Sequence, residues 1–263
     1  MEENKRPKVS IITVVLNGEK TLERTIQSVL NQTYPQIEYL IIDGGSDDGS
    51  VAIIKKYQKK ISYWVSEKDK GLYDAMNKGI RQASGEWVLI LNSDDYYLNN
   101  KAIEEAVKCI KKRNKTDKNF YYFTIFHEFP NGWRKKYKRV INCWNKWRLY
   151  WSAYIPHLAL WVNKKQYEEI GLYDLNFKIA ADHDFILRLT KKYRPVFIDL
   201  PLAVMTIGGR SSRDEKKTFW EFRQVTIKNG LPALVADVIF WLKIGKLKLK
   251  NFLGKHLTKQ KDF

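Results

Sequence analysis

The sequence lacks several features that would assign it to a large class of proteins. Among its 263 residues there are only two cysteines, Cys109 and Cys143, and their separation matches no metal-binding spacing. A disulfide scaffold and a zinc finger are therefore excluded, and a reducing compartment is favoured. No apolar run approaches the ~20 residues that span a membrane, and the charged start MEENKRPK is unlike a signal peptide. We expect a cytoplasmic protein.

Two nucleotide-binding motifs are missing as well. No GxGxxG opens the first expected helix and GxxxxGKS/T does not occur, so a dinucleotide-binding or P-loop fold is disfavoured. General disorder is excluded, because 44% of the residues are hydrophobic and 14% are aromatic. A chain of this length can bury a sizeable core.

Acidic residues are scarce in the second half of the chain. Residues 1–99 hold 13 Lys and Arg against 14 Asp and Glu, whereas residues 100–263 hold 34 against 15, and the net charge is +18. This asymmetry predicts that the second half faces an anionic partner. The candidates are nucleic acid, an anionic membrane surface and a phosphorylated substrate.

Apolar runs and amphipathic segments alternate through the first 99 residues. Buried strands are predicted at 9–16, 37–42, 61–65 and 87–91, and helices at 19–31, 50–59 and 73–82. This alternation predicts a parallel sheet with right-handed crossovers, and such sheets bind ligands at the carboxyl ends of their strands. Those ends carry Asn17 (also expected to cap the first helix), Asp43, Asp69 and the pair Asp94 and Asp95.

The residues at the strand ends constrain the ligand. The glycines of DGGSDDGS let the backbone turn tightly beside a flat ligand. A carboxylate only accepts hydrogen bonds, so Asp43 suits the N–H of a base or the hydroxyls of a sugar. Asp94 and Asp95 repel each other unless they are solvated, hydrogen-bonded or neutralised by a cation, and they suit Mg²⁺ or Mn²⁺ bridging phosphates. A polar turn is the alternative interpretation of this pair. A nucleotide diphosphate with a divalent metal satisfies all of these demands.

Five segments, taken together, resemble the inverting nucleotide-sugar glycosyltransferases of family 2, which have the GT-A fold. They are SIITVVLN, IIDGGSDDGS, SEKDKGLYDAMNKG, GEWVLILNSDD and AADHDFILRL, within residues 7–215. The DKGLYDAMNKG segment is especially similar to bacterial transferases of exopolysaccharide assembly, including the colanic-acid type. The resemblance implies an α/β fold with a mostly parallel sheet flanked by helices. Residues 1–99 would bind the donor, 100–219 the acceptor, and 220–263 would form a helical extension.

The resemblance also assigns roles on the donor side. Asp43 is the expected base-binding carboxylate. The full set of expected donor contacts is Thr13, Asn17, Asp43, Gly45, Ser46, Asp69, Lys70, Asp74, Asn77, Asn92, Ser93 and Asp94. Asn92-Ser93-Asp94 matches the family's Asp-x-Asp metal motif with Asn at its first position. We therefore expect Mg²⁺ or Mn²⁺ on Asp94 with Asp95 close by, although the departure leaves open which carboxylate holds the metal.

On the acceptor side, Asp182 matches the general base of the family. Inverting transfer needs one carboxylate to take the proton of the acceptor hydroxyl. The alternative role of Asp182 is to cap a helix at 185–192. Asp184 and His157 are expected to contact the acceptor, although a lone histidine is more often structural. The loop with Gly209, Arg210 and Ser211 resembles the family's GG-x-S loop and is expected to bind phosphate, with a plain flexible loop as the alternative.

Basic and aromatic segments complete the second half. A strand at 120–129, a turn at Asn131-Gly132 and a basic return strand at 133–141 are expected to form a solvated edge hairpin, with contact to a phosphate-bearing acceptor as the alternative for the basic strand. Residues 228–263 hold eight lysines and two aspartates in an imperfect apolar stripe. This pattern predicts a basic amphipathic helix on an anionic membrane, at the inner face of the cytoplasmic membrane, or else a helix packed on the domain. An aromatic cluster is expected to pack in the core or at an interface, with sugar stacking or a lipid-facing patch as the alternative; its residues are Trp144, Trp147, Tyr150, Trp151 and Tyr154.

We therefore predict an inverting transferase that moves a sugar from a nucleotide donor, expected to be UDP-linked, to a hydroxyl of a growing, lipid-linked glycan. A nucleotidyltransferase with the same metal–nucleotide site is one alternative. A nucleic-acid-binding protein is the other. It would place basic residues along the first sheet edge, where carboxylates are found, so nucleic acid is not an expected partner.

Overall fold

The computed structural model describes residues 6–113, 118–137, 146–208 and 214–259. Within these ranges the chain builds one mixed sheet in the order β3-β2-β1-β4-β8-β6-β9-β5, with β7 paired to β6. The first half supplies a parallel part, as predicted. Its strands are β1 (Val9–Val15), β2 (Ile37–Asp43), β3 (Tyr63–Ser66) and β4 (Trp87–Asn92).

The second half continues the sheet with mixed strand directions. Strand β8 (Leu160–Asn163) runs antiparallel to both β4 and β6 (Asn119–Glu128). The long strand β9 (Arg194–Thr206) pairs parallel to β6, and the short β5 (Tyr96–Tyr97) pairs antiparallel to β9. Strand β9 therefore brings Thr206 beside the turn that follows β4. Sequence patterns did not predict β5 or β9.

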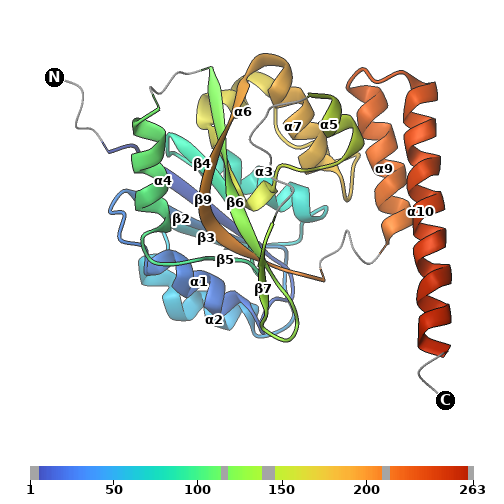
Figure 1. Ribbon diagram of the computed structural model, residues 1–263. Coiled ribbons are helices and arrows are strands. Elements are labelled where there is room, and N and C mark those ends of the chain that lie inside the picture. The colour runs from blue at the N-terminus through green and yellow to red at the C-terminus, as the bar shows by residue number, and fades with distance from the viewer. Residues whose placement is uncertain (1–5, 114–117, 138–145, 209–213, 260–263) are drawn as a thin grey trace.

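Both faces of the sheet are covered by helices, so alternate residues of one strand enter different cores. Ile11 of β1 packs with α1 (Leu22–Leu30), α2 (Ser50–Tyr57) and α4 (Ala102–Lys111). Ile12 packs on the opposite face with α3 (Leu72–Gln82), α6 (Lys164–Ile170) and α7 (Ala181–Lys192). Figure 1 shows these two layers on either side of the sheet. Helix α3 approaches closely, because a Cβ at Gly79 would lie 2.4 Å from Ile12.

The last two helices form a hairpin at one flank of the molecule. Helix α9 (Glu215–Lys228) packs on α7, and α10 (Ala233–Lys259) lies along α9 (Figure 1). This hairpin occupies the place of the expected extension from residue 220, although it begins at Glu215. Short helices complete the described fold: η1 (Gln58–Lys60), α5 (Lys146–Trp151) and η2 (His157–Ala159). No helix in the described ranges is both long and apolar enough to cross a membrane.

Two local predictions can be compared directly with the structure. Asn17 does not cap the first helix: α1 starts at Leu22 after Thr21, and Asn17 instead adopts φ of 55° in the preceding turn. The turn at Asn131-Gly132 joins β6 to the exposed β7 (Arg134–Lys136), and Gly132 has φ of 78°. Residues 138–141 of the expected return strand lie outside the described residues.

Candidate active site

Asp43 organises the loop that follows β2. Its Oδ2 accepts hydrogen bonds from the N–H groups of Gly45 (3.1 Å) and Ser46 (3.0 Å) and from the Ser66 hydroxyl (2.6 Å). Its Oδ1 accepts one from the Ser46 hydroxyl (2.5 Å), and the side chain has no exposed surface. These four hydrogen bonds hold the buried carboxylate of Asp43 within its own loop, and its contact with the base stays a prediction. Asp43 shapes the turn at Gly45, whose φ is 84°.

Asn17 joins the end of β1 to the same loop. Its N–H donates to the Ser46 hydroxyl (2.8 Å), and its Oδ1 accepts from the N–H of Asp47 (3.0 Å). The side chain is exposed. Asn17, Gly45 and Ser46 thus lie together at the carboxyl edge of the sheet, where the sequence placed them.

Asp69 is the carboxylate of the β3 end that remains partly exposed. Its Oδ1 accepts from the N–H of Gly71 (2.7 Å), and its Oδ2 lies so close to Gly44 that a Cβ there would come within 2.3 Å. Glycine at position 44 therefore leaves room for this carboxylate. Asp74 accepts a hydrogen bond from the N–H of the exposed Lys70 (3.0 Å) and holds the start of α3.

Two other expected donor contacts are buried in the fold. Thr13 lies within β1 with no exposed surface, and its hydroxyl is 3.1 Å from that of Tyr39. Asn77 is 2% exposed and exchanges two hydrogen bonds of 2.9 Å with the backbone of Tyr173. Both side chains are paired within the fold, and their contacts with the donor stay predictions. Asn77 fixes α3 to the segment before α7.

The turn after β4 carries the two aspartates in different environments. Asp95 is 1% exposed, and its oxygens accept from the N–H of Thr206 (3.1 Å) and the amide of Asn92 (3.1 Å). Burial and the charge of Asp94 raise the pKa of Asp95 to about 8. Burial also raises the pKa of Asp94, which remains partly exposed. The charge of Arg24 only partly offsets these effects on the two aspartates.

The residues around this turn fit a divalent cation that is shared with a ligand. The Oδ1 of Asn92 is buried and has no hydrogen-bond partner within the described part of the chain. In that part no three His, Cys, Asp or Glu side chains are grouped as a metal cage. Mg²⁺ and Mn²⁺ suit such a site, because Mg²⁺ is usually held by one or two carboxylates together with substrate phosphates. Asp94 is the accessible carboxylate, with Ser93 partly buried beside it.

An arginine that sequence patterns did not point to lies beneath the turn. Arg24 of α1 donates to the backbone oxygen of Asp94 (3.3 Å), to the Thr206 hydroxyl (3.2 Å) and to Glu128 (2.8 Å). Glu128 also pairs with Arg134 of β7 (3.0 Å). This network ties α1, β6, β7 and β9 to the turn. It was not visible in the sequence because Arg24 and Glu128 are 104 residues apart.

Asp182 lies in the first turn of α7 and is partly exposed. The N-cap position belongs to Ala180, so the alternative that Asp182 caps the helix is wrong. Its Oδ1 accepts from the Tyr73 hydroxyl (3.2 Å) and from the N–H of His183 (2.8 Å). Tyr73 belongs to α3, which starts directly after the Asp69 turn. One side chain thus joins the candidate base to the donor edge.

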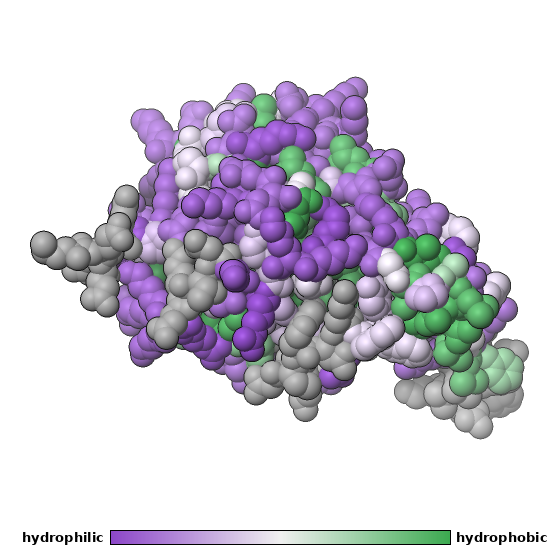
Figure 2. Space-filling model, turned by 90° about the horizontal axis from the view of Figure 1, so that it is seen from above, coloured by the Kyte–Doolittle hydropathy of each residue, from purple (hydrophilic) through white to green (hydrophobic). Residues whose placement is uncertain are grey.

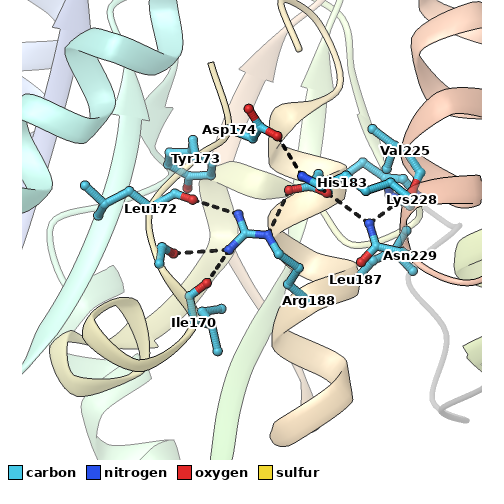
Figure 3. A network of polar contacts seen from close by, with 12 residues as sticks. Ile170, Leu172, Tyr173, Asp174, His183, Leu187, Arg188, Val225, Lys228 and Asn229 are labelled. Carbon is cyan, nitrogen blue, oxygen red and sulfur yellow. Dashed lines mark hydrogen bonds and ion pairs between the residues drawn. The ribbon is translucent and has the colours of Figure 1, made fainter. Parts of the chain in front are cut away.

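Asp184, which is expected to contact the acceptor, is paired within the fold. Its carboxylate is completely buried and is paired with Arg188 (2.8 Å), Lys228 (3.1 Å) and the amide of Asn229 (2.9 Å). Figure 3 shows Arg188 reaching from α7 to backbone oxygens at Ile170 and Leu172, while Lys228 and Asn229 approach from the end of α9. In this structure the carboxylate of Asp184 connects α7 to the end of α9, and its contact with the acceptor stays a prediction.

His157 is partly buried at the start of η2, and its Nε2 lies 2.6 Å from the Tyr173 hydroxyl. Burial lowers its pKa, which favours the neutral ring. In the aromatic cluster, Tyr150 and Tyr154 are buried, whereas Trp147 and Trp151 are exposed. Trp144, Gly209, Arg210 and Ser211 lie outside the described residues.

Comparisons with known proteins decide the class of this site. The family model described as glycosyl transferase family 2 matches residues 10–179. The chain belongs to glycosyltransferase family 2. This glycosyltransferase is 33% identical over 229 residues to an uncharacterized glycosyltransferase of Mycobacterium tuberculosis, covering 83% of each chain. It is 26% identical over 247 residues to a PGL/p-HBAD biosynthesis glycosyltransferase of Mycobacterium bovis, covering 90% of this chain and 92% of the relative.

Solved structures show the same GT-A fold. Residues 1–349 of TarS from S. aureus in complex with UDP-GlcNAc align with a TM-score of 0.66 at 19% identity, covering 89% of this chain and 70% of that one. The mannosyltransferase PcManGT from Pyrobaculum calidifontis, in complex with GDP-Man and Mn²⁺, aligns with a TM-score of 0.65 at 18% identity, covering 90% and 71%. Membership of this family makes the chain a glycosyltransferase, and the nucleotidyltransferase and nucleic-acid alternatives are set aside.

Proposed function

We propose that this enzyme transfers a sugar from a UDP-linked donor to a hydroxyl of a lipid-linked or growing surface glycan, with inversion at the anomeric carbon. The observation that carries the proposal is that a carboxylate of the second half, Asp182, is held next to the sheet edge that carries the carboxylates of the first half. Asp69 and Asp94 lie at the strand ends, and Asp182 is held by Tyr73, which follows the Asp69 turn in the chain. In this arrangement Asp69 and Asp94 face the nucleotide-sugar donor, and Asp182 is the general base for the acceptor.

The reaction needs one displacement. Asp182 accepts the proton of the acceptor hydroxyl as its oxygen forms a bond to the anomeric carbon. The bond from that carbon to the diphosphate oxygen breaks on the opposite face, and no covalent sugar–enzyme intermediate is required. A bound Mg²⁺ or Mn²⁺ would stabilise the charge of the leaving diphosphate. Asp94 would hold this cation, and Asp95 would orient the turn through Thr206 and Asn92.

The donor assignment can be tested by thermal shift. A panel of UDP- and GDP-sugars should raise the melting temperature only when Mn²⁺ or Mg²⁺ is present, with the largest shift for a UDP-sugar. The expectation of UDP is supported by the complex of the similar TarS structure, whereas the mannosyltransferase structure contains GDP-Man. If GDP-sugars give the larger shift, the UDP assignment is wrong. If no nucleotide sugar has an effect with either metal, the proposed function is wrong.

The proposed acceptor side includes an anionic membrane surface contacted by residues 228–263. Helix α10 packs Ala236 and Ile244 inward, and Ile239 of the expected stripe is also partly buried. A second apolar face points outward, and Figure 2 shows hydrophobic surface gathered at this end of the molecule. Its residues are between 42% and 77% exposed: Leu234, Val235, Val238, Trp241, Leu242, Leu249 and Phe252.

The charge around this outer face favours lipid as the partner. At 3.6 residues per turn the seven apolar residues fall on one side of α10, and Lys246 and Lys248 fall on its two borders. Both lysines are exposed. If two copies of the protein met through this face of α10, their lysines would repel each other. An anionic lipid surface can bury the apolar residues and also pair with Lys246 and Lys248.

Replacing Trp241, Leu242 and Leu249 with serine should weaken binding to phosphatidylglycerol-containing vesicles by about tenfold or more, because the inserted apolar area is lost. Co-sedimentation measures this. Trp147→Ser is the matched control, since Trp147 is 70% exposed on α5 and lies outside α10. The membrane proposal fails if the wild-type protein does not bind these vesicles. It also fails if the triple variant keeps its binding and instead changes its oligomeric state.

A further inference from the structure

The start of α7 is held by a side chain from another helix. The carboxylate Oε2 of Glu221, on α9, accepts hydrogen bonds from three consecutive backbone N–H groups. They belong to Lys178 (2.9 Å), Ile179 (2.7 Å) and Ala180 (3.1 Å). Glu221 is only 6% exposed, and Ala180, at the N-cap position, makes no capping bond with its own side chain. A carboxylate from another helix thus binds the N–H of the N-cap residue Ala180 and those of the two residues before it.

This carboxylate suits its position physically. The N–H groups at the start of a helix lack partners within the helix, and the helix dipole favours negative charge there. Hydrogen bonds to an ionised carboxylate are stronger than those between neutral groups. Removing Glu221 would leave three backbone donors without this acceptor. The segment 178–180 would then lose its attachment to α9.

The same segment is fixed from the opposite side by Tyr73. Its hydroxyl donates to the backbone oxygen of Ile179 (2.6 Å) and to Oδ1 of Asp182 (3.2 Å). The segment that leads into Asp182 therefore has its N–H groups bound by α9 and one carbonyl bound by α3. Asp182 follows Ala180 by two residues, so these contacts also fix the position of its carboxylate.

We propose that Glu221 is a positioning residue for the catalytic base, so that α9 is part of the active site. This rests on the proposed function of Asp182. Glu221 lies beyond residues 10–179, the part of the chain that matches the family model. Displacement of a reacting group by ~1 Å can cost about 100-fold in rate, so a contact that fixes the segment 178–182 acts on turnover and not on donor binding.

Three variants test the proposal. Glu221→Ala should lower kcat by about 100-fold and leave the donor KM and the donor-induced thermal shift unchanged. Glu221→Gln should restore most of kcat, to within about tenfold of the wild type, because the amide oxygen still accepts hydrogen bonds. Glu215→Gln is the matched control: it removes the other glutamate of α9, which pairs with Lys250, and should keep wild-type kcat.

Hydrogen exchange supplies a readout that does not depend on an acceptor. Glu221→Ala should speed exchange of the amides of 178–180 while the β1–β4 amides stay protected, and Glu221→Gln remains available if the alanine variant does not fold. The proposal is overturned if exchange at 178–180 is unchanged. It is also overturned if Glu221→Ala keeps wild-type kcat, or loses donor binding in proportion to turnover. A wild-type enzyme that transfers no sugar would instead count against the proposed function, and the exchange experiment would still decide on Glu221.

Discussion

Replacing Asp182 with Asn should lower sugar transfer by about 1,000-fold while the donor binds as tightly as it does to the wild-type enzyme. General base catalysis contributes about 100- to 10,000-fold, and an amide of the same shape cannot take the proton of the acceptor hydroxyl. The Asn oxygen can still accept from Tyr73 and from the N–H of His183, so α7 should keep its position. Initial rates with labelled donor measure transfer, and calorimetry measures donor binding.

Asp184→Asn on the same helix is the matched contrast. Its buried carboxylate is paired with Arg188, Lys228 and Asn229, so neutralising it leaves the largely buried guanidinium of Arg188 without its anionic partner, whereas Lys228 keeps Asp174. Breaking a buried pair in this way costs about 3–5 kcal/mol, and the melting temperature should fall clearly. Asp182→Asn should leave the melting temperature within a few degrees of wild type. If both variants lose stability equally and Asp182→Asn retains transfer per folded molecule, Asp182 is a structural residue and the base lies elsewhere.

The parallel part of the fold could be predicted from the sequence because its signals are local. The apolar runs at 9–16 and 87–91 are long enough for buried strands, and each is followed by turn residues. Their carboxyl ends do meet at one edge, as strand–helix alternation requires. Strand β9 was not predicted, and it contains Pro195 and Pro201, a residue type that is rare inside strands. The structure accommodates Pro201 where β6 and β9 shift register, next to Thr124.

Side-chain burial could not be predicted in the same way. The motif identifies Asp43 and Asn77 but does not show whether their polar atoms face a ligand or the fold. Asp43 is occupied by its own loop, and Asn77 by the backbone of Tyr173, 96 residues away. Glu221 was missed for the same physical reason: a lone glutamate on a helix carries no sign that it will meet backbone donors 41 to 43 residues earlier. Such partners are set by how α7 and α9 pack.

The second large effect concerns Asp94 and Asp95 in the absence of metal. The pKa of Asp95 is raised to about 8 by burial and by Asp94, whereas an unfolded aspartate titrates near ~3.9. The folded protein therefore binds a proton more tightly than the unfolded chain. The contribution of Asp95 to the free energy of unfolding should be largest below about pH 4. It should fall by a few kcal/mol as the pH rises to about 8. Urea titrations of metal-free protein across this range measure the slope.

Asp95→Asn should remove most of that slope and stabilise the metal-free protein at pH 8, because its amide carries no charge beside Asp94.

Asp94→Ala should also flatten the slope, but it should in addition weaken binding of a nucleoside diphosphate in Mn²⁺ by about tenfold or more, because the accessible carboxylate is lost. Mn²⁺ together with the diphosphate should offset the loss of stability in the wild-type protein and not in Asp94→Ala. Unchanged nucleotide affinity in Asp94→Ala would exclude this residue as the metal contact. A Mn²⁺ effect that is lost only in Asp95→Asn would assign the metal to the buried carboxylate, and the turn would then have to open when the donor binds.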